Sequence, residues 1–163
     1  MKRLLVMRHA KSSWGDASLA DFKRPLNDRG KRTAPFMGTL IADNGLVPDV
    51  IVSSPAARAR ATTELAAEAM KYSGDAIFDP EIYEASPNTL VRVLSEISDE
   101  YETAMLVGHN PGLESIVYHL TGVFEPMPTA ALAVIQLDIE SWGDVNSGTG
   151  DLSAIYRPRE LMK

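Results

Sequence analysis

Three short apolar runs stand out against the polar background of the chain, at residues 4–7, 50–52 and 104–107. Each run is followed by a few polar residues and then by a segment with helical spacing of its apolar positions. Short, continuous apolar runs in this rhythm are typical of parallel strands that helices bury on both faces. The pattern therefore predicts an α/β sheet.

The segments between these runs show helical periodicity with recognisable ends. A first helix is expected to follow residues 27–30 and to end at Asn44-Gly45, and Pro35 inside it indicates a kink or a late start. A short strand at 76–78 is expected between the second and third helices. The other helices are expected at about 56–70, from Pro87 through Ile97, and from near Pro111 to Thr121-Gly122.

The last third of the chain changes character. Residues 131–139 and 152–156 read as two strands, and the stretch 142–151 between them is rich in Gly, Asp and Ser. This arrangement predicts an antiparallel hairpin at the edge of the sheet. With no internal repeat and no long linker, we expect one domain over residues 1–163, a three-layer α/β/α sandwich whose central sheet is mainly parallel.

The amino-acid composition excludes several kinds of binding partner and site. The formal net charge is −6 and the pI is about 5.0, which argues against a broad surface for nucleic acid or for an anionic membrane. Cysteine is absent, so disulfides, thiolate catalysis and cysteine-based metal sites are excluded. The apolar run at the N-terminus breaks at Arg8, too early for a signal peptide or a membrane span. We expect a cytoplasmic protein that is not bound to a membrane.

The residues that follow the predicted strands carry the chemistry. In open α/β sheets, ligands bind beyond the carboxyl ends of the strands. Arg8 and His9 follow the first strand, Arg58 lies one turn beyond the second, and His109 follows the strand at 104–107. The next helix N-terminus would add N–H donors and a partial positive charge, so the sequence predicts a pocket for a phosphate ion. By contrast, His119 sits in an amphipathic helical pattern and reads as structural.

These residues resemble the signature motifs of the histidine phosphatase superfamily. Arg8-His9-Ala10 resembles its Arg-His-Gly motif, residues 53–62 its arginine motif, and residues 108–112 its second histidine motif. Residues 21–26 and 26–30 also find counterparts, which points to the small phosphohistidine phosphatases of the SixA type. One departure is Ala10 in place of the usual glycine, which makes a backbone with positive φ costly there.

The resemblance implies a double-displacement mechanism without a metal or another cofactor. His9 attacks phosphorus as a neutral imidazole and forms a phosphohistidine enzyme, which water then hydrolyses. Arg8, Arg58 and a cationic His109 hold the phosphoryl oxygens and neutralise their charge in the transition state. Nearby positive charge should lower the pKa of His9, and a hydrogen bond to a backbone carbonyl should fix its tautomer.

The resemblance also implies the remaining site residues. Glu84 matches the proton donor of larger family members, with Glu81 as the second choice. Ser12, Arg24 and Asn110 lie in the matching motifs and are expected to bind the substrate together with the arginines and His109.

The substrate class follows from a segment that is missing. Larger relatives insert a helical cap over the site, whereas here the helix beginning at Pro87 follows Glu84 almost at once. We therefore expect no cap domain and an open site that admits phosphohistidine on a protein. A small-molecule phosphomonoesterase or sugar phosphatase with the same His9 chemistry is the alternative, and a non-catalytic phosphate-binding module is the less favoured one.

Overall fold

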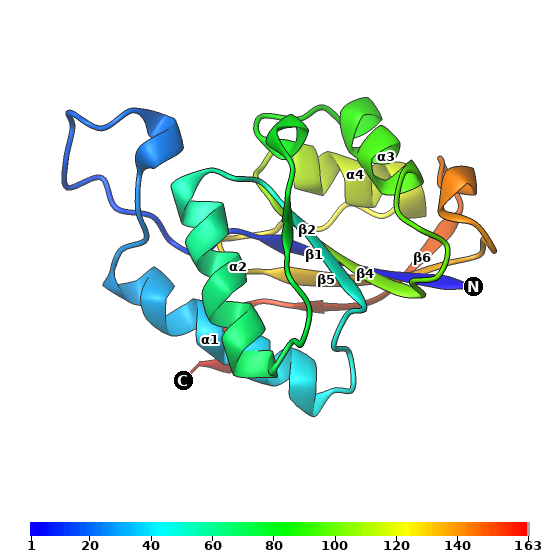
Figure 1. Ribbon diagram of the computed structural model, residues 1–163, viewed down its shortest axis with the longest axis horizontal. Coiled ribbons are helices and arrows are strands. Elements are labelled where there is room, and N and C mark those ends of the chain that lie inside the picture. Colours follow the sequence, from blue (N-terminus) through cyan, green and yellow to red (C-terminus); the bar gives the residue numbers. More distant parts are fainter. Residues whose placement is uncertain (163) are drawn as a thin grey trace.

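The computed structural model describes residues 1–162 and contains a six-stranded sheet at its centre (Figure 1). The strand order is β3-β2-β4-β1-β5-β6, in which β3, β2, β4 and β1 are parallel and β5 and β6 are antiparallel to their neighbours. The strands are β1 (Lys2–Arg8), β2 (Val50–Ser53), β3 (Ile77–Phe78), β4 (Thr103–Gly108), β5 (Leu132–Leu137) and β6 (Gly150–Tyr156). The expected edge hairpin is confirmed as β5 and β6.

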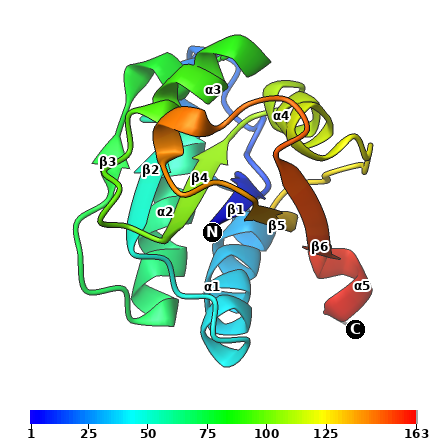
Figure 2. The same ribbon diagram turned by 90° about the vertical axis from the view of Figure 1, so that its right-hand side faces the viewer.

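Helices cover both faces of this sheet, as the end-on view shows (Figure 2). The helices α1 (Asp28–Asp43) and α2 (Ala57–Met70) pack on one face, and α3 (Pro87–Ser95) and α4 (Gly112–Thr121) on the other; a short α5 (Pro158–Leu161) follows β6. Successive side chains of β1 point to opposite faces: Leu4 and Val6 join the core under α3 and α4, and Leu5 and Met7 join the core under α1 and α2. The predicted three-layer α/β/α fold without a separate cap domain is confirmed.

The first helix corrects one expectation. It begins at Asp28, where the Asn27 side chain accepts a hydrogen bond from the Gly30 N–H, and it runs through Pro35 without the late start that the proline suggested. The N-cap satisfies a backbone donor that the first turn leaves free, and this fixes the start of the helix seven residues ahead of the proline. The expected end at Asn44-Gly45 is confirmed, with Gly45 at a positive φ.

Strand register brings the predicted site residues to one edge. Arg8 at the end of β1 pairs with Gly108 of β4, and Ser53 at the end of β2 pairs with Val107. Because these strands are parallel, the segments that follow them emerge side by side. Within residues 1–162, no helix is both long and apolar enough to cross a membrane.

Candidate active site

A cavity of about 640 Å³ opens at the carboxyl ends of the parallel strands. Its lining includes Arg58 from α2, His109 after β4, and residues of the segment between β3 and α3. His9 is almost fully buried and contacts both: its ring centroid lies 5.2 Å from that of His109, and its Nε2 lies 3.4 Å from Nε of Arg58. The structure therefore brings His9, Arg58 and His109 together, as the sequence predicted.

The geometry of His9 defines its protonation. Its Nδ1 lies 2.7 Å from the carbonyl oxygen of Ala10. A carbonyl can only accept, so Nδ1 carries the proton and Nε2 keeps its lone pair. Burial, with smaller contributions from the positive charges of Arg58 and Arg8, lowers the pKa of His9 from 6.5 to about 3. The expected neutral imidazole is thus produced mainly by burial and only secondarily by nearby cations.

His109 is held from behind the cavity. Its Nε2 lies 2.8 Å from the hydroxyl of Ser54, while its Nδ1 is buried without a hydrogen-bond partner among residues 1–162. Unsatisfied buried polar atoms are rare in folded proteins and call for an explanation such as a ligand. Burial, with a further contribution from Arg58, lowers the pKa of His109 to about 4. In the free pocket His109 is therefore neutral, because burial penalises the charged ring; the cationic form was expected for the transition state.

The guanidinium of Arg58 is oriented by the loop before α1. It donates to the main-chain oxygen of Asp21 at 2.7 Å and to its carboxylate at 3.0 Å. The Tyr83 hydroxyl donates to the same carboxylate at 2.6 Å. That hydrogen bond, and next the contact with Arg58, lower the pKa of Asp21 to about 2, while Asp21 raises the pKa of Tyr83 to about 12. Asp21 therefore stays ionised and keeps Arg58 aligned.

A threonine ties the loop after β1 to α2. The Thr62 hydroxyl donates to the carbonyl of Arg58 at 2.7 Å and accepts from the N–H of Ala10 at 2.9 Å. One hydroxyl thereby links the loop that carries His9 to the helix turn that carries Arg58. Ala10 itself is fully buried at a φ outside the positive range, so the residue that replaces the family's glycine is not strained.

Arg8 is placed differently from His9, Arg58 and His109. Its charge acts on His9 and His109, yet its side chain lines a separate pocket and not the cavity described above. It donates to the main-chain oxygen of Met127 at 3.2 Å. The side-chain amide of Asn110, which does line the cavity, donates to the same oxygen at 2.9 Å.

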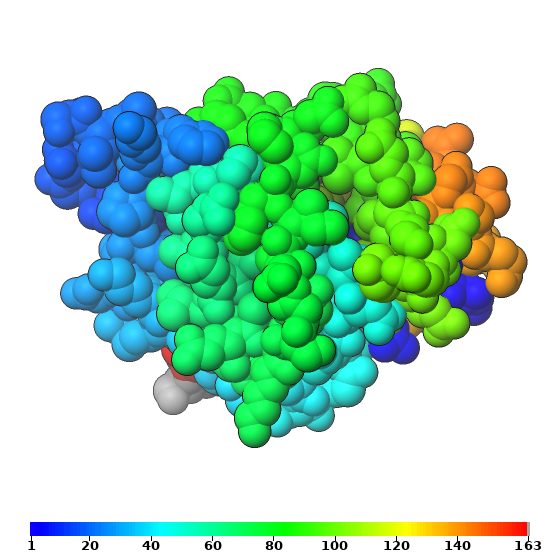
Figure 3. Space-filling view, in the orientation of Figure 1, coloured from blue at the N-terminus to red at the C-terminus, as the bar shows by residue number. Residues whose placement is uncertain are grey.

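Ser12 and Arg24, expected to bind substrate, are not among the residues that line the cavity. Arg24 donates to the Ser12 hydroxyl at 2.7 Å and to the Asp21 carboxylate at 3.2 Å, and its guanidinium lies 3.5 Å from the ring centroid of Trp14. These contacts hold the loop that supplies Asp21. Figure 3 shows this loop, in blue, against the green surface of the segment that contains Tyr83, in agreement with an edge-to-face contact of Phe22 and Tyr83.

The structure distinguishes between the two glutamates considered as proton donors. Glu84 lines the cavity next to Tyr83 and has a left-handed backbone with φ of 55°. Glu81 does not line it and forms an ion pair with the exposed Arg92. A non-glycine residue at positive φ is uncommon and often marks a functional position.

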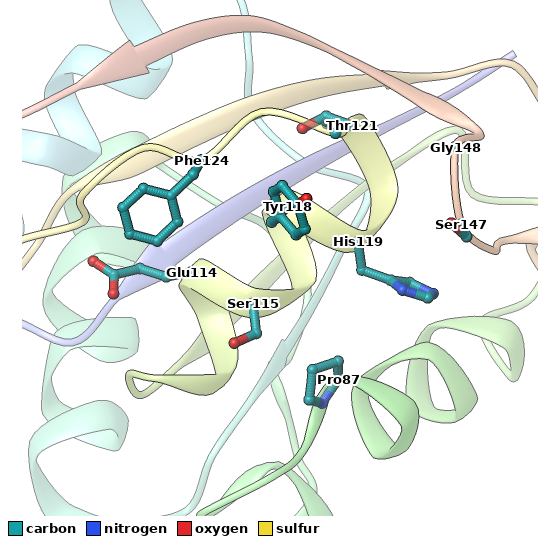
Figure 4. Close-up of a pocket in the computed structure, with 10 residues that line it drawn as sticks. Pro87, Glu114, Ser115, Tyr118, His119, Thr121, Phe124, Ser147 and Gly148 are labelled. Atoms are coloured by element: carbon teal, nitrogen blue, oxygen red, sulfur yellow. The ribbon is translucent and has the colours of Figure 1, made fainter.

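The third histidine lies elsewhere. His119 lines a hollow of about 510 Å³ on the outer side of α4, together with Tyr118, Phe124 and Pro87 (Figure 4). No group of three or more His, Asp or Glu side chains within residues 1–162 is placed to hold a metal ion.

Sequence reasoning assigned no role to Asp21, Tyr83, Ser54 or Thr62. Asp21, Ser54 and Thr62 each form a hydrogen bond with a predicted site residue, and Tyr83 forms one with Asp21. For Asp21 a signal existed, because it lies in a motif that was recognised and is the only acidic residue within it. Tyr83 gave no local signal, since its partner Asp21 is 62 positions away.

Comparison with known proteins places these features in a family. Residues 4–106 match the model of the histidine phosphatase superfamily, branch 1. An uncharacterised protein of Mycobacterium tuberculosis is 31% identical over 167 residues, covering 94% of this chain and all of the relative. A candidate phosphohistidine phosphatase SixA from Agrobacterium tumefaciens is 30% identical, with a TM-score of 0.82 over 96% of this chain and 98% of its own.

A second solved structure agrees with this placement at the level of the fold. The protein histidine phosphatase SixA in complex with tungstate superposes with a TM-score of 0.85 over 98% of this chain and 99% of its own, at 22% identity. The family model covers more than half of the chain, and the mycobacterial relative matches nearly its whole length. The chain therefore belongs to branch 1 of the histidine phosphatase superfamily and has the fold of its SixA members.

Proposed function

We propose that this protein is a phosphatase that works through a phosphohistidine at His9 and removes phosphate from phosphohistidine on proteins. One observation carries the mechanism. The unprotonated Nε2 of a buried, neutral His9 lies beside Arg58 and His109 at the carboxyl ends of the strands. An unprotonated nitrogen that accepts only a long hydrogen bond from Arg58, beside that guanidinium, is the arrangement that attack on an anionic phosphoryl group requires.

The reaction divides into two displacements. In the first, Nε2 of His9 forms a bond to phosphorus while the bond from phosphorus to the leaving group breaks, and Glu84 gives that group its proton. In the second, water attacks the phosphohistidine, Nε2 is released, and inorganic phosphate leaves. Arg8 and Arg58 supply positive charge throughout. Arrival of a phosphoryl dianion raises the pKa of His109, so its cationic form belongs to the loaded enzyme and not to the free one.

The substrate assignment rests on access. Among residues 1–162 no cap covers the cavity, and beside it the loop that supplies Asp21 presents two exposed aromatic side chains, Trp14 and Phe22, to solvent. Exposed aromatic groups are enriched at protein–protein contacts. The similarity to a candidate SixA phosphatase over nearly the whole chain supports the same substrate class. Tungstate imitates phosphate, and its presence in a SixA structure of this fold supports a phosphate pocket here.

The proposed function is tested by comparing wild type, one active-site variant and one control variant on two kinds of substrate. Wild type, His9→Ala and a control His119→Ala are incubated with a ³²P-labelled phosphohistidine protein and with phosphate monoesters. We expect wild type and the control to form an acid-labile phosphoenzyme and to release phosphate faster from the protein, and His9→Ala to do neither. Normal labelling of His9→Ala would contradict the mechanism. Preference for small esters would instead identify a phosphomonoesterase, and binding without turnover by wild type would identify a phosphate-binding module.

Metal dependence provides a separate test. If arginines carry the charge that a metal carries in other phosphoryl-transfer enzymes, EDTA leaves the rate unchanged and vanadate inhibits by imitating the five-coordinate transition state. Loss of the rate in EDTA that magnesium restores would contradict this assignment.

A further inference from the structure

A second pocket of about 330 Å³ is lined by Arg8, whose charge also acts on His9 and His109 of the candidate active site. We call it the basic pocket. Four of its lining residues are cationic and none is acidic, although the whole chain carries a formal charge of −6. The lining consists of Arg8, Lys11, Arg29, Thr33, Pro128, Thr129, Pro158 and Arg159.

The first wall of the basic pocket is held by backbone contacts. The N–H of Asn27 donates to the carbonyl of Lys11 at 3.0 Å, and a Cβ added to Gly30 would lie 2.2 Å from that oxygen. Only glycine at this position lets the start of α1 lie against the Lys11 backbone, and this contact brings Lys11 and Arg29 into one wall. Arg29 stands in the first turn of α1, where the helix dipole disfavours a cation and favours an anion.

The opposite wall is also anchored. Arg157, which precedes α5, donates to the main-chain oxygen of Pro126 at 3.0 Å and pairs with Glu125 at 2.7 Å. These bonds tie α5 to the segment that supplies Pro128 and Thr129, and Pro158 is buried there. Figure 2 shows the red α5 at the end of β6, on the same side of the sheet as α1, and Arg159 of α5 lines the basic pocket together with Arg29 of α1.

Three of the four charges in this ring have no acidic partner in the described part of the chain, whereas Glu114 acts electrostatically on Arg8. Within residues 1–162, Lys11, Arg29 and Arg159 have no acidic side chain within 4.0 Å, and the neighbouring Glu160 pairs with Arg157 instead. Like charges around a concave surface focus a positive potential into it. Such a ring is stabilised when an anion enters, and guanidinium groups match the oxygens of phosphate in a bidentate manner.

We propose that the basic pocket binds a phosphate-type oxyanion at a site distinct from the phosphoryl group that reacts at His9. This anion is either a free inorganic ion or a second anionic group of the substrate itself. Arg8 faces the basic pocket and also acts electrostatically on His9 and His109, so the two sites are coupled through one guanidinium.

The binding arm of the test counts sites by calorimetry with inorganic phosphate, and it needs no turnover. We expect wild type to bind two phosphate ions per chain, Arg29→Gln/Arg159→Gln to bind one, and Arg58→Gln to lose the other. The control, Lys31→Gln/Arg32→Gln, removes two exposed cations from the same helix that do not line the pocket, and should keep both sites. Thermal unfolding of each variant checks that it is folded.

A single phosphate site in wild type, or two sites in Arg29→Gln/Arg159→Gln, would overturn the proposal even if the phosphatase proposal holds.

The kinetic arm of the test rests on the proposed phosphatase function and compares a sugar monophosphate with its bisphosphate. The preference is measured as kcat/KM for the bisphosphate divided by kcat/KM for the monophosphate. If the second phosphate of the substrate fills the basic pocket, this ratio falls roughly tenfold in Arg29→Gln/Arg159→Gln and stays constant in the control Lys31→Gln/Arg32→Gln. If that ratio is unchanged while a phosphate site is lost, the natural occupant is the free ion.

Discussion

The buried His9 and the half-buried His109 make stability depend on pH in a window where few other groups titrate. Burial lowers the pKa of His9 to about 3 and that of His109 to about 4 in the folded protein. In the unfolded chain both return to about 6.5. Below that pH the unfolded chain binds two protons that the folded protein does not bind. The free energy of unfolding therefore falls as the pH falls from 7 toward 4.

The magnitude follows from the displacement of the two pKa values. At pH 5 each histidine is about 1.5 pH units below its unfolded pKa, which is worth about 2 kcal/mol, or about 4 kcal/mol for both. That is a large part of the 5–15 kcal/mol typical of a domain. Asp21 does not interfere, because its pKa is lowered and its contribution is lost only when the pH falls below about 4.

Urea unfolding at pH 7, 6 and 5 measures this directly. Wild type should lose about 4 kcal/mol across the range, while His9→Gln and His109→Gln should each lose about 2 kcal/mol. The chain has three histidines, and His119→Gln, outside the cavity, should behave as wild type. Because only the change with pH is compared, a variant that is less stable at every pH remains informative. An equal pH dependence in wild type and both pocket variants would refute the reasoning.

Three further changes test the surroundings of the cavity. Asp21→Asn removes the carboxylate that holds Arg58 in place and should weaken inhibition by vanadate roughly threefold or more, because the guanidinium loses a charge-assisted hydrogen bond; unchanged or tighter inhibition would argue against this role. Thr62→Val leaves the buried N–H of Ala10 without an acceptor and should lower the free energy of unfolding by about 1–3 kcal/mol in urea, whereas an unchanged midpoint would show that the bond is dispensable. Glu84→Gln should slow alkyl phosphate esters roughly a hundredfold and nitrophenyl phosphate far less, and an equal defect across leaving groups would remove Glu84 as the proton donor.

The fold was predictable because its signals are local or follow from simple topology. Apolar runs locate the strands, and the parallel order then requires that the residues after β1, β2 and β4 emerge together. That is why His9, Arg58 and His109 could be grouped although about fifty positions separate each from the next. The late start suggested by Pro35 was wrong because capping by Asn27 determines where α1 begins.

Features of the site that depend on long-range contacts were not predictable. The roles of Asp21 and Tyr83 depend on a hydrogen bond between two loops, and no periodic pattern marks either loop. The charge of His109 depends on its burial, which only the packed structure reveals. Arg24 was expected to touch substrate, and nothing in the sequence indicated its bonds to Ser12 and Asp21, which hold the loop.

The stacking of Arg24 on Trp14 gives the protein an intrinsic optical signal. The chain has two tryptophans: Trp14 is 76% exposed, whereas Trp142 is fully buried in the core under α3 and α4. A soluble quencher therefore reaches the first indole and not the second. Because Arg24 also binds Asp21, which in turn binds Arg58, tryptophan emission reports on the loop next to the cavity. We therefore expect occupancy of the cavity to change the emission of Trp14, which stopped-flow fluorescence can follow without a dye.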